Sequence, residues 1–148
     1  MKKIHFLFAF IAIGCFSLML SSCKKSTTGG NSCTTTMANL AGTYSLVKVE
    51  SSFSGAFIDV TSLLPACQTD DHVVLNANGT AAYQDLGTAC TPPNDGTGTW
   101  TLSGNVISAP TLGPPPGLNG TISSFDCTNL VVLDTTSGGD IYRVTLKK

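Results

Sequence analysis

Charged residues are scarce in this sequence. They make up 11% of 148 residues, with eight lysines and arginines, nine aspartates and glutamates, and a formal net charge of -1. Coiled coils and disordered charged tails need many more charges, so the composition excludes both classes. Lysine and arginine never cluster beyond pairs, so we expect no nucleic-acid partner. The length suits a single domain.

Recognisable catalytic and cofactor motifs are also missing. His72 is the only histidine after the first 22 residues, and no nucleophile motif such as Gly-x-Ser-x-Gly accompanies it. No phosphate loop or dinucleotide motif occurs, so we predict that the protein is not an enzyme and uses no cofactor. Asp70 and Asp71 would suit a calcium ion, but further oxygen ligands are not evident. We therefore interpret the pair as a solvated strand entry and predict no metal site.

The N-terminal segment differs from the rest of the chain. Lys2 and Lys3 precede an apolar run over residues 4–20, a pattern typical of a secretory signal peptide. The run is also as long as a short transmembrane helix, about 17 to 25 residues. An uncleaved membrane anchor is therefore the alternative interpretation.

A short motif favours the signal peptide. Leu20-Ser21-Ser22-Cys23 follows the apolar run and resembles the bacterial lipobox, an aliphatic residue and two small residues before a cysteine. The resemblance implies lipidation of Cys23, removal of residues 1–22 and acylation of the new N-terminus. Several acyl chains hold a protein durably on a bilayer, whereas one does so only marginally. Lys24 stands where an aspartate would imply inner-membrane retention, so we expect a lipid anchor in the outer membrane of a bacterial cell envelope, on either face.

The mature chain is expected to have two parts. Residues 23–32 contain the lipidated cysteine and a polar stretch rich in glycine, serine and threonine, which we interpret as a flexible tether. Residues 33–148 form the folded domain. Two of the eight basic residues lie in the removed segment, so the mature chain has a formal charge of -3.

Four cysteines remain for disulfides once Cys15 is assigned to the signal peptide and Cys23 to lipid. An even number in an exported chain indicates two disulfides, with three possible pairings. A zinc site would need CxxC spacing or histidine companions, and neither is present. The four residues are Cys33, Cys67, Cys90 and Cys127.

An Asn-Gly pair suggests how these cysteines are joined. Asn78 and Gly79 separate two short β-type runs, and this dipeptide is the strongest short hairpin signal. If these are the two loop residues, the residue numbers of any two residues paired across the hairpin add up to 157. The residue numbers of Cys67 and Cys90 also add up to 157. The extended hairpin therefore brings Cys67 opposite Cys90, within the reach of a disulfide. Cys33 is left to pair with Cys127.

The rest of the domain is predicted to be all-β. Short β-branched and aromatic runs recur between turn residues, and no helical spacing is sustained apart from one possible turn within residues 61–67. About eight strands with short links form an antiparallel meander, and closure into a small barrel removes its exposed edges; a two-layer sandwich is the alternative. The expected strands are 42–51, 56–60, 71–76, 80–86, 98–103, 106–108, 121–125, 129–134 and 140–147.

Alternation along these strands predicts which side chains point inward. Trp100 and Leu102 share the inner face of their strand, and Arg143 lies on the outer face of the last strand. In the hairpin, the 157 register places His72 across from Asp85, which we interpret as an exposed pair. The inner face of the hairpin is expected to contain Val73, Leu75, Ala82 and Leu86, with Val74 and Tyr83 on the outer face.

A series of segments suggests a family. Leu40-Ala41-Gly42-Thr43-Tyr44 is similar to the Gly-x-Trp start of lipocalins, with tyrosine in place of tryptophan. Further segments follow in order: Cys67, Asp70-Asp71, residues 74–80, Cys90, residues 98–107 and residues 142–147. Together they span residues 40–148 and resemble the lipocalin-like domain of bacterial lipoproteins. The resemblance implies a small barrel that binds small apolar ligands.

Two features depart from that family. The C-terminal helix of lipocalins is missing. Lipocalins also place an arginine from the end of the barrel over the first-strand tryptophan, whereas Arg143 is predicted to face outward and away from Tyr44.

Two functions are compatible with these observations. We expect a monomeric, membrane-anchored lipoprotein whose barrel interior accepts a small apolar molecule, because eight strands can enclose one small ligand. The alternative is a disulfide-stapled structural or interaction module with a packed core, which presents loops such as residues 110–117 to a protein or glycan. A filled interior beside Trp100 and an exposed apolar loop patch would favour this alternative. The expected lining residues of a ligand site are Tyr44, Leu46, Leu75, Trp100 and Leu102.

Overall fold

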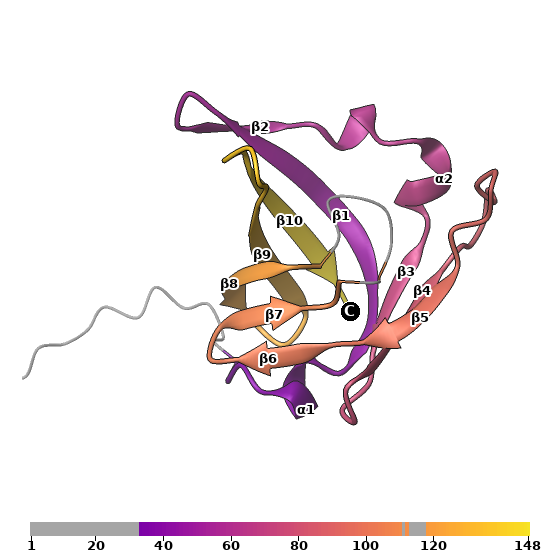
Figure 1. The fold of residues 1–148 in the computed structure, drawn as a ribbon, viewed down its shortest axis with the longest axis vertical. Helices are drawn as coiled ribbons and strands as arrows, with labels where there is room; N and C mark the ends of the chain where they lie inside the picture. Colours follow the sequence, from indigo (N-terminus) through magenta and orange to yellow (C-terminus); the bar gives the residue numbers. More distant parts are fainter. Residues whose placement is uncertain (1–32, 111, 113–117) are drawn as a thin grey trace, which may run out of the picture.

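The chain is almost entirely β-structure (Figure 1). In the computed structural model, which describes residues 33–110, 112 and 118–148, ten strands form one antiparallel sheet that is nearly closed into a barrel. The predicted all-β barrel is thus confirmed. The expected signal peptide, the lipidation site at Cys23 and the tether lie outside the described residues, as does most of loop 110–117. Among the helices of the described residues, none has the length and apolar character needed to cross a membrane.

Every predicted strand is present, and the main change is a break at Trp100, which divides the fifth strand into two. The one helical turn expected after the second strand is replaced by two short helices. The strands are β1 (Gly42–Phe53), β2 (Ala56–Asp59), β3 (His72–Leu75), β4 (Thr80–Gln84), β5 (Gly96–Thr99), β6 (Thr101–Ser103), β7 (Val106–Ser108), β8 (Gly120–Phe125), β9 (Asn129–Thr135) and β10 (Ile141–Lys147). The helices are α1 (Met37–Leu40), η1 (Thr61–Leu63) and α2 (Ala66–Thr69).

The strand order makes a ring. Along the sheet the order is β5-β4-β3-β1-β10-β9-β8-β7-β6, with β2 added beside β1. Only Trp100 separates β5 from β6, so the two ends of the sheet meet in one continuous segment. Counting β5 and β6 as one position and leaving β2 aside, the ten strands give eight positions around the barrel. Apart from β2, strands that follow one another in the chain are neighbours, which is an up-and-down meander.

The barrel has two distinct ends because successive strands are antiparallel. At one end, which we call the α1 end, lie α1, the β3–β4, β6–β7 and β8–β9 turns, and the last residue of β10, which pairs with Ser45 and Asn129. At the other, the α2 end, lie the β1–β2 hairpin, η1, α2, the β4–β5 loop and the β9–β10 turn. These ends are at the bottom and top of Figure 1, respectively. The 12 residues of β1 connect them.

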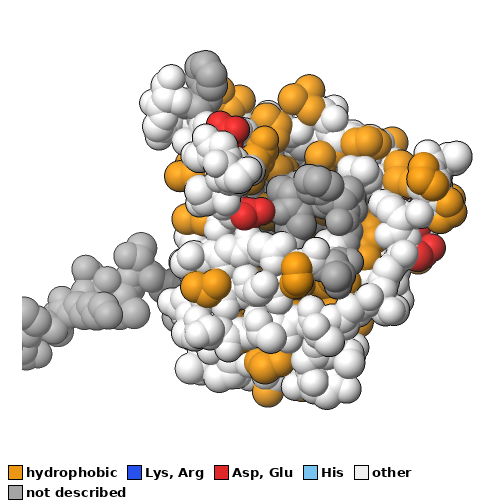
Figure 2. Space-filling model, viewed as in Figure 1, with side chains coloured by type: hydrophobic (Ala, Val, Ile, Leu, Met, Phe, Trp, Pro, Cys, Tyr) orange, Lys and Arg blue, Asp and Glu red, His pale blue; other side chains and the backbone are white. Residues whose placement is uncertain are grey.

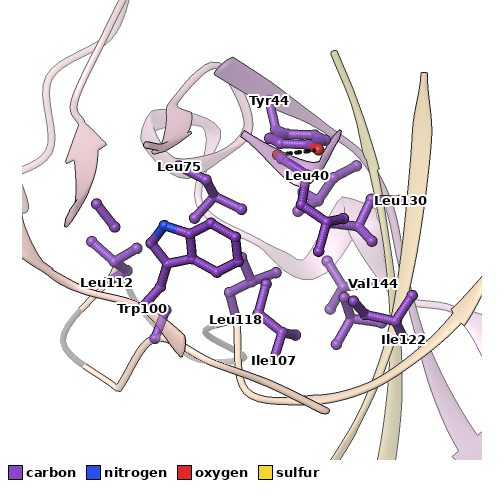
Figure 3. Packing of buried hydrophobic residues seen from close by; sticks show 14 of the residues in the cluster. Leu40, Tyr44, Leu75, Trp100, Ile107, Leu112, Leu118, Ile122, Leu130 and Val144 are labelled. Atoms are coloured by element: carbon purple, nitrogen blue, oxygen red, sulfur yellow. Dashed lines mark hydrogen bonds between the residues drawn. The ribbon is translucent and has the colours of Figure 1, made fainter. Parts of the chain in front are cut away.

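Helix α1 closes the α1 end. Thr36 caps the helix by accepting a hydrogen bond from the backbone N–H of Asn39 at 3.2 Å. The short helix turns Leu40 into the barrel, where its side chain is completely buried. Leu40 lies next to Tyr44 (Figure 3) and belongs to the same hydrophobic core as Trp100.

The register of the β3–β4 hairpin differs by one residue from the prediction. Val73 pairs with Tyr83, so opposed positions sum to 156 instead of 157. The reason is the turn: Asn76 N–H donates to the Thr80 carbonyl, which leaves three loop residues with Gly79 at a φ of 85°. A three-residue loop with glycine in this left-handed position is a common hairpin connection.

A shift of one residue reverses the faces of β4. Tyr83, predicted to lie outside, is buried, whereas Ala82 is only half-buried and Leu86 is 39% exposed. His72 pairs with Gln84 and not with Asp85. The predicted His72–Asp85 pair is therefore wrong, as is the assignment of Ala82 and Leu86 to the interior.

Candidate functional site

The predicted ligand-lining residues lie together in the hydrophobic core. Tyr44, Leu75 and Trp100 are each at most 1% exposed, while Leu46 and Leu102 are partly buried and pack against them. In Figure 3 the Trp100 ring lies among aliphatic side chains from several elements, including Leu75 and Leu118. Burial of these apolar side chains against one another stabilises the protein interior.

The polar atoms of the two central aromatic residues are satisfied within the chain. Trp100 Nε1 donates to the Asn76 carbonyl at 2.8 Å, and the Tyr44 hydroxyl donates to the Leu40 carbonyl at 2.7 Å. Burial raises the pKa of Tyr44, which keeps the phenol protonated. Neither group is left to orient a bound molecule, so these residues act as core in the structure.

A cation does lie near Tyr44, but it is not an arginine. Lys148 Nζ lies 5.5 Å from the centroid of the Tyr44 ring and 5.6 Å from that of Phe125, and it donates to the Asn39 carbonyl. These contacts are cation–π interactions, and burial lowers the pKa of Lys148. Lys148 was not among the site residues predicted from the sequence. Alternate residues of the last strand share one face, so the pattern that places Val144 and Leu146 inside also places residue 148 on the inner side.

Arg143 faces outward, as predicted, and joins an ionic cluster centred on Glu50. Arg143 Nε lies 2.6 Å from Glu50 Oε2, and Lys48 Nζ lies 2.9 Å from Glu50 Oε1. The Arg143 guanidinium also stacks 4.2 Å from the centroid of the Phe57 ring. Hydrogen bonds from Arg143 and then from Lys48 lower the pKa of Glu50 to about 2, against the opposing effect of burial. This cluster links β1 to β10 and β2, the strands that pair with it, through side chains on the outer face of the sheet.

Asp71 is buried, contrary to the predicted solvated strand entry. Its side chain is 3% exposed and accepts hydrogen bonds from the Tyr83 hydroxyl at 2.7 Å and from the Leu86 N–H at 2.9 Å. Burial is the larger cause that raises the pKa of Tyr83, and its hydrogen bond to Asp71 adds to the effect. The one-residue register shift produces this contact, because it places Tyr83 on the inner face of the sheet, where Asp71 is buried.

Other carboxylates at the α2 end shape the β4–β5 loop. Asp85 accepts from the Cys90 N–H, Asp95 accepts from the Asp85 N–H, and Asp70 accepts from the Thr88 N–H. Ligand-type atoms of Asp71, Asp85 and Cys90 come within 4.8 Å of one another. The Cys90 sulfur is bonded to Cys67, however, so it is not available as a thiolate ligand. The arrangement supports the loop.

Two disulfides are present. Cys67–Cys90 connects α2 to the β4–β5 loop with a Cα–Cα distance of 5.1 Å. Both cysteines lie outside β3 and β4, so strand pairing of the hairpin does not extend to them. The positions of α2 and of the β4–β5 loop bring the two sulfur atoms together. Cys33–Cys127 joins the start of the described domain to the β8–β9 turn, with a Cα–Cα distance of 5.3 Å. The Cys33 N–H also donates to the Phe125 carbonyl at 3.0 Å, which places the chain entry at the α1 end.

Exposed apolar side chains occur mainly toward the α2 end. Leu63 in η1 is 79% exposed, Ile58 in β2 is 52% exposed and Leu86 after β4 is 39% exposed. Figure 2 shows hydrophobic side chains gathered over the region of η1, α2 and the β4–β5 loop. Two comparably exposed residues lie elsewhere: Val47 in β1 at 51%, and Val106 at the α1 end at 49%. Clustered exposed apolar residues mark interaction surfaces more often than isolated ones do.

Comparison of the chain with protein-family models, with curated proteins and with solved structures finds no match. Any functional assignment therefore depends on the geometry of the chain itself.

Proposed function

We propose that this protein is a membrane-anchored lipoprotein of the bacterial cell envelope whose barrel serves as an interaction module for a protein or glycan. The observation that supports this role best is the packing around Trp100, which is 1% exposed and has its N–H bonded within the chain. The expected lining residues already contact one another and other core residues. The outer surface, and not the interior, is then the place for recognition.

The surface that we propose for recognition is the α2 end. Leu63 and Ile58 project there, where the β1–β2 hairpin and η1 extend beyond the body of the barrel (Figure 1). A lipid on Cys23 would hold the opposite end near the membrane, because ten residues of tether span at most about 35 Å and the chain enters the domain at Cys33. The α2 end would then face away from the bilayer, accessible to a partner.

The lipid anchor is tested with Cys23→Ala in the full chain. We expect the wild-type protein to sediment with membranes and to show a diacylglyceryl cysteine at its N-terminus by mass spectrometry. The variant should retain residues 1–22 and lack the lipid mass. A wild-type chain whose N-terminus is unmodified, or is cleaved elsewhere, would exclude the lipoprotein assignment.

The interaction role is tested by crosslinking in intact cells with Leu63→Ser and the matched control Val106→Ser. Both side chains are exposed, so neither substitution disturbs the core. We expect a specific crosslinked species that decreases several-fold with Leu63→Ser and persists with Val106→Ser. Equal yields from both variants would exclude the α2 end as the recognition surface.

A small apolar ligand inside a lipocalin-like barrel is the second candidate. The eight strand positions favour it, since barrels of this size can enclose one small molecule. Trp100 is the only tryptophan, so its fluorescence reports on the interior without interference. A saturable shift on titration with fatty acids, sterols or haem would support this candidate, whereas an unchanged spectrum would favour the packed module.

A further inference from the structure

We propose that the α1 end is a lipid-facing surface on which Lys147 and Lys148 contact an anionic bilayer and hold the barrel upright. The inference deepens the proposed lipid anchor at Cys23 and depends on it. It concerns which part of the folded domain meets the membrane and which lipid headgroups it prefers. The observation that carries it is the separation of charge along the barrel.

Positive charge without an acidic partner, in the described part of the chain, is concentrated at the α1 end. Four basic residues are described, and two of them, Lys48 and Arg143, are bound to Glu50. The other two, Lys147 and Lys148, follow one another where β10 ends, and both are exposed. The Lys148 ammonium contacts the Asn39 carbonyl and two aromatic rings but no carboxylate side chain of the described residues, so its charge is not balanced by an ion pair there.

One carboxylate, Asp126, lies at the α1 end. It accepts hydrogen bonds from the Thr128 N–H and from the backbone and side chain of Asn129, which lower its pKa and keep it ionised. Two lysines and one aspartate give the side chains of the described α1 end a charge of +1, although the mature chain as a whole is acidic.

Negative charge without a basic partner is concentrated at the α2 end. None of these carboxylates has a salt bridge within the described residues, in contrast to Glu50 and Asp59. They occur in the segment after α2, in the β4–β5 loop, near the end of β9 and in the β9–β10 turn. The residues are Asp70, Asp71, Asp85, Asp95, Asp134 and Asp140.

The length of the barrel makes this separation effective. The 12 residues of β1 extend about 40 Å, whereas electrostatic interactions are screened over about 8 Å at physiological salt. Only the end that touches the bilayer interacts strongly with its headgroups. An upright barrel brings two lysines to an anionic surface, and a tilted or inverted barrel brings uncompensated carboxylates there.

The chain entry favours the same orientation. The Cys33–Cys127 disulfide and the hydrogen bond from the Cys33 N–H to the Phe125 carbonyl hold the start of the domain at the α1 end. An anchor attached before this point therefore keeps both lysines close to the membrane. The polybasic contribution is about 1 kcal/mol for each lysine near an anionic surface, which corresponds to about a fivefold change in population.

The orientation is measured by NMR with the lipidated mature protein in nanodiscs. One set contains phosphatidylcholine alone and the other contains added phosphatidylglycerol, and both include a lipid with a nitroxide headgroup. In the anionic discs we expect paramagnetic broadening of backbone amides in the β6–β7 and β8–β9 turns and little in the β9–β10 turn. In the zwitterionic discs the contrast between the two ends should decrease several-fold.

Charge variants test whether the lysines are responsible. Lys147→Gln should reduce the difference in broadening between the two ends of the barrel about fivefold in anionic discs. Lys147 makes no side-chain hydrogen bond within the described residues, so the variant should still fold. Asp140→Asn is the matched control, because it changes the charge by one unit at the other end and should preserve the contrast. Equal contrast in both lipid mixtures, or an unchanged contrast in Lys147→Gln, would overturn the inference.

Failure of the anchor is distinguishable from failure of the inference. If mass spectrometry shows that Cys23 is not acylated, the proposed lipoprotein is excluded. The mature chain can then be attached through an N-terminal histidine tag to nickel-chelating lipids, and the same broadening experiment still tests the lysine surface by itself.

Discussion

Asp71 and Glu50 are the buried charged residues of the described chain, and each is tied to particular partners. Burying a carboxylate is costly unless it is hydrogen-bonded. Asp71 receives the Tyr83 hydroxyl and a backbone N–H, while Glu50 receives Arg143 and Lys48. Neither environment is visible in the sequence, because all the side-chain partners other than Lys48 are separated from their carboxylates by at least 12 residues.

Tyr83→Phe should destabilise the protein by about 1.5 to 3 kcal/mol, because it leaves the buried Asp71 carboxylate with one hydrogen bond fewer. The change is measured as the free energy of unfolding in urea. Tyr142→Phe is the control, since its half-buried hydroxyl has no hydrogen-bond partner within the described residues. Equal losses in both variants would contradict a specific role for the Tyr83–Asp71 bond.

Glu50 should make stability depend on pH in the acidic range. Its pKa is lowered from 4.5 to about 2 in the folded protein. Between these pH values the unfolded chain binds a proton that the folded chain does not, so the free energy of unfolding decreases as pH falls through this window.

Urea denaturation at a series of pH values measures this dependence in the wild type and in Glu50→Gln. We expect the variant to be less stable at neutral pH and to have a shallower slope between pH 4.5 and 2. Some slope should remain, since hydrogen bonds also lower the pKa values of Asp59 and Asp126. An unchanged slope would exclude Glu50 as a contributor.

The local sequence pattern predicted where each strand lies, but the turns determined the register in which the strands pair. The β-branched runs between glycine, proline and asparagine were sufficient to locate every strand. The Asn78-Gly79 pair correctly indicated a hairpin, yet the loop has three residues instead of two. Both turn types accept this dipeptide, so local sequence could not choose between them. One residue of difference then decided whether Tyr83 faced the core or the solvent.

Gly79→Ala tests the turn. Gly79 has a φ of 85°, where a Cβ costs about 1 to 2 kcal/mol, and we expect a loss of that size in urea denaturation. Gly138→Ala is the control. Gly138 is not among the positive-φ glycines and its Cβ would meet no atom closer than 3.7 Å, so its effect should stay within about 0.5 kcal/mol. Similar losses for both would show that backbone strain is not the cause.

At the scale of the whole molecule, two disulfides and one aromatic residue join segments that are distant in sequence. Trp100 lies where β5 continues into β6, so it is both the point of ring closure and part of the core. Cys33–Cys127 spans 94 residues and fixes the chain entry to the β8–β9 turn. Cys67–Cys90 spans 23 residues within one end of the barrel.

Removal of the two disulfides should have unequal effects. In the chain-entropy model, loops of 94 and 23 residues correspond to about 4.7 and about 3.5 kcal/mol, respectively. We therefore expect Cys33→Ser/Cys127→Ser to lower the free energy of unfolding more than Cys67→Ser/Cys90→Ser does. The measurement is urea denaturation of both double variants. A larger loss from the shorter loop would indicate that contacts of α2, and not chain entropy, dominate.

The sequence by itself determined the fold class, the positions of the strands and the inward orientation of Trp100, because these depend on local alternation and on turn residues. It also determined that four cysteines would form two disulfides. Only the tertiary structure decided the hairpin register, the burial of Asp71, the position of Lys148 near Tyr44 and the separation of charge between the two ends. Each of these depends on how strands distant in the chain are aligned, and a shift of one residue in a sheet exchanges its two faces.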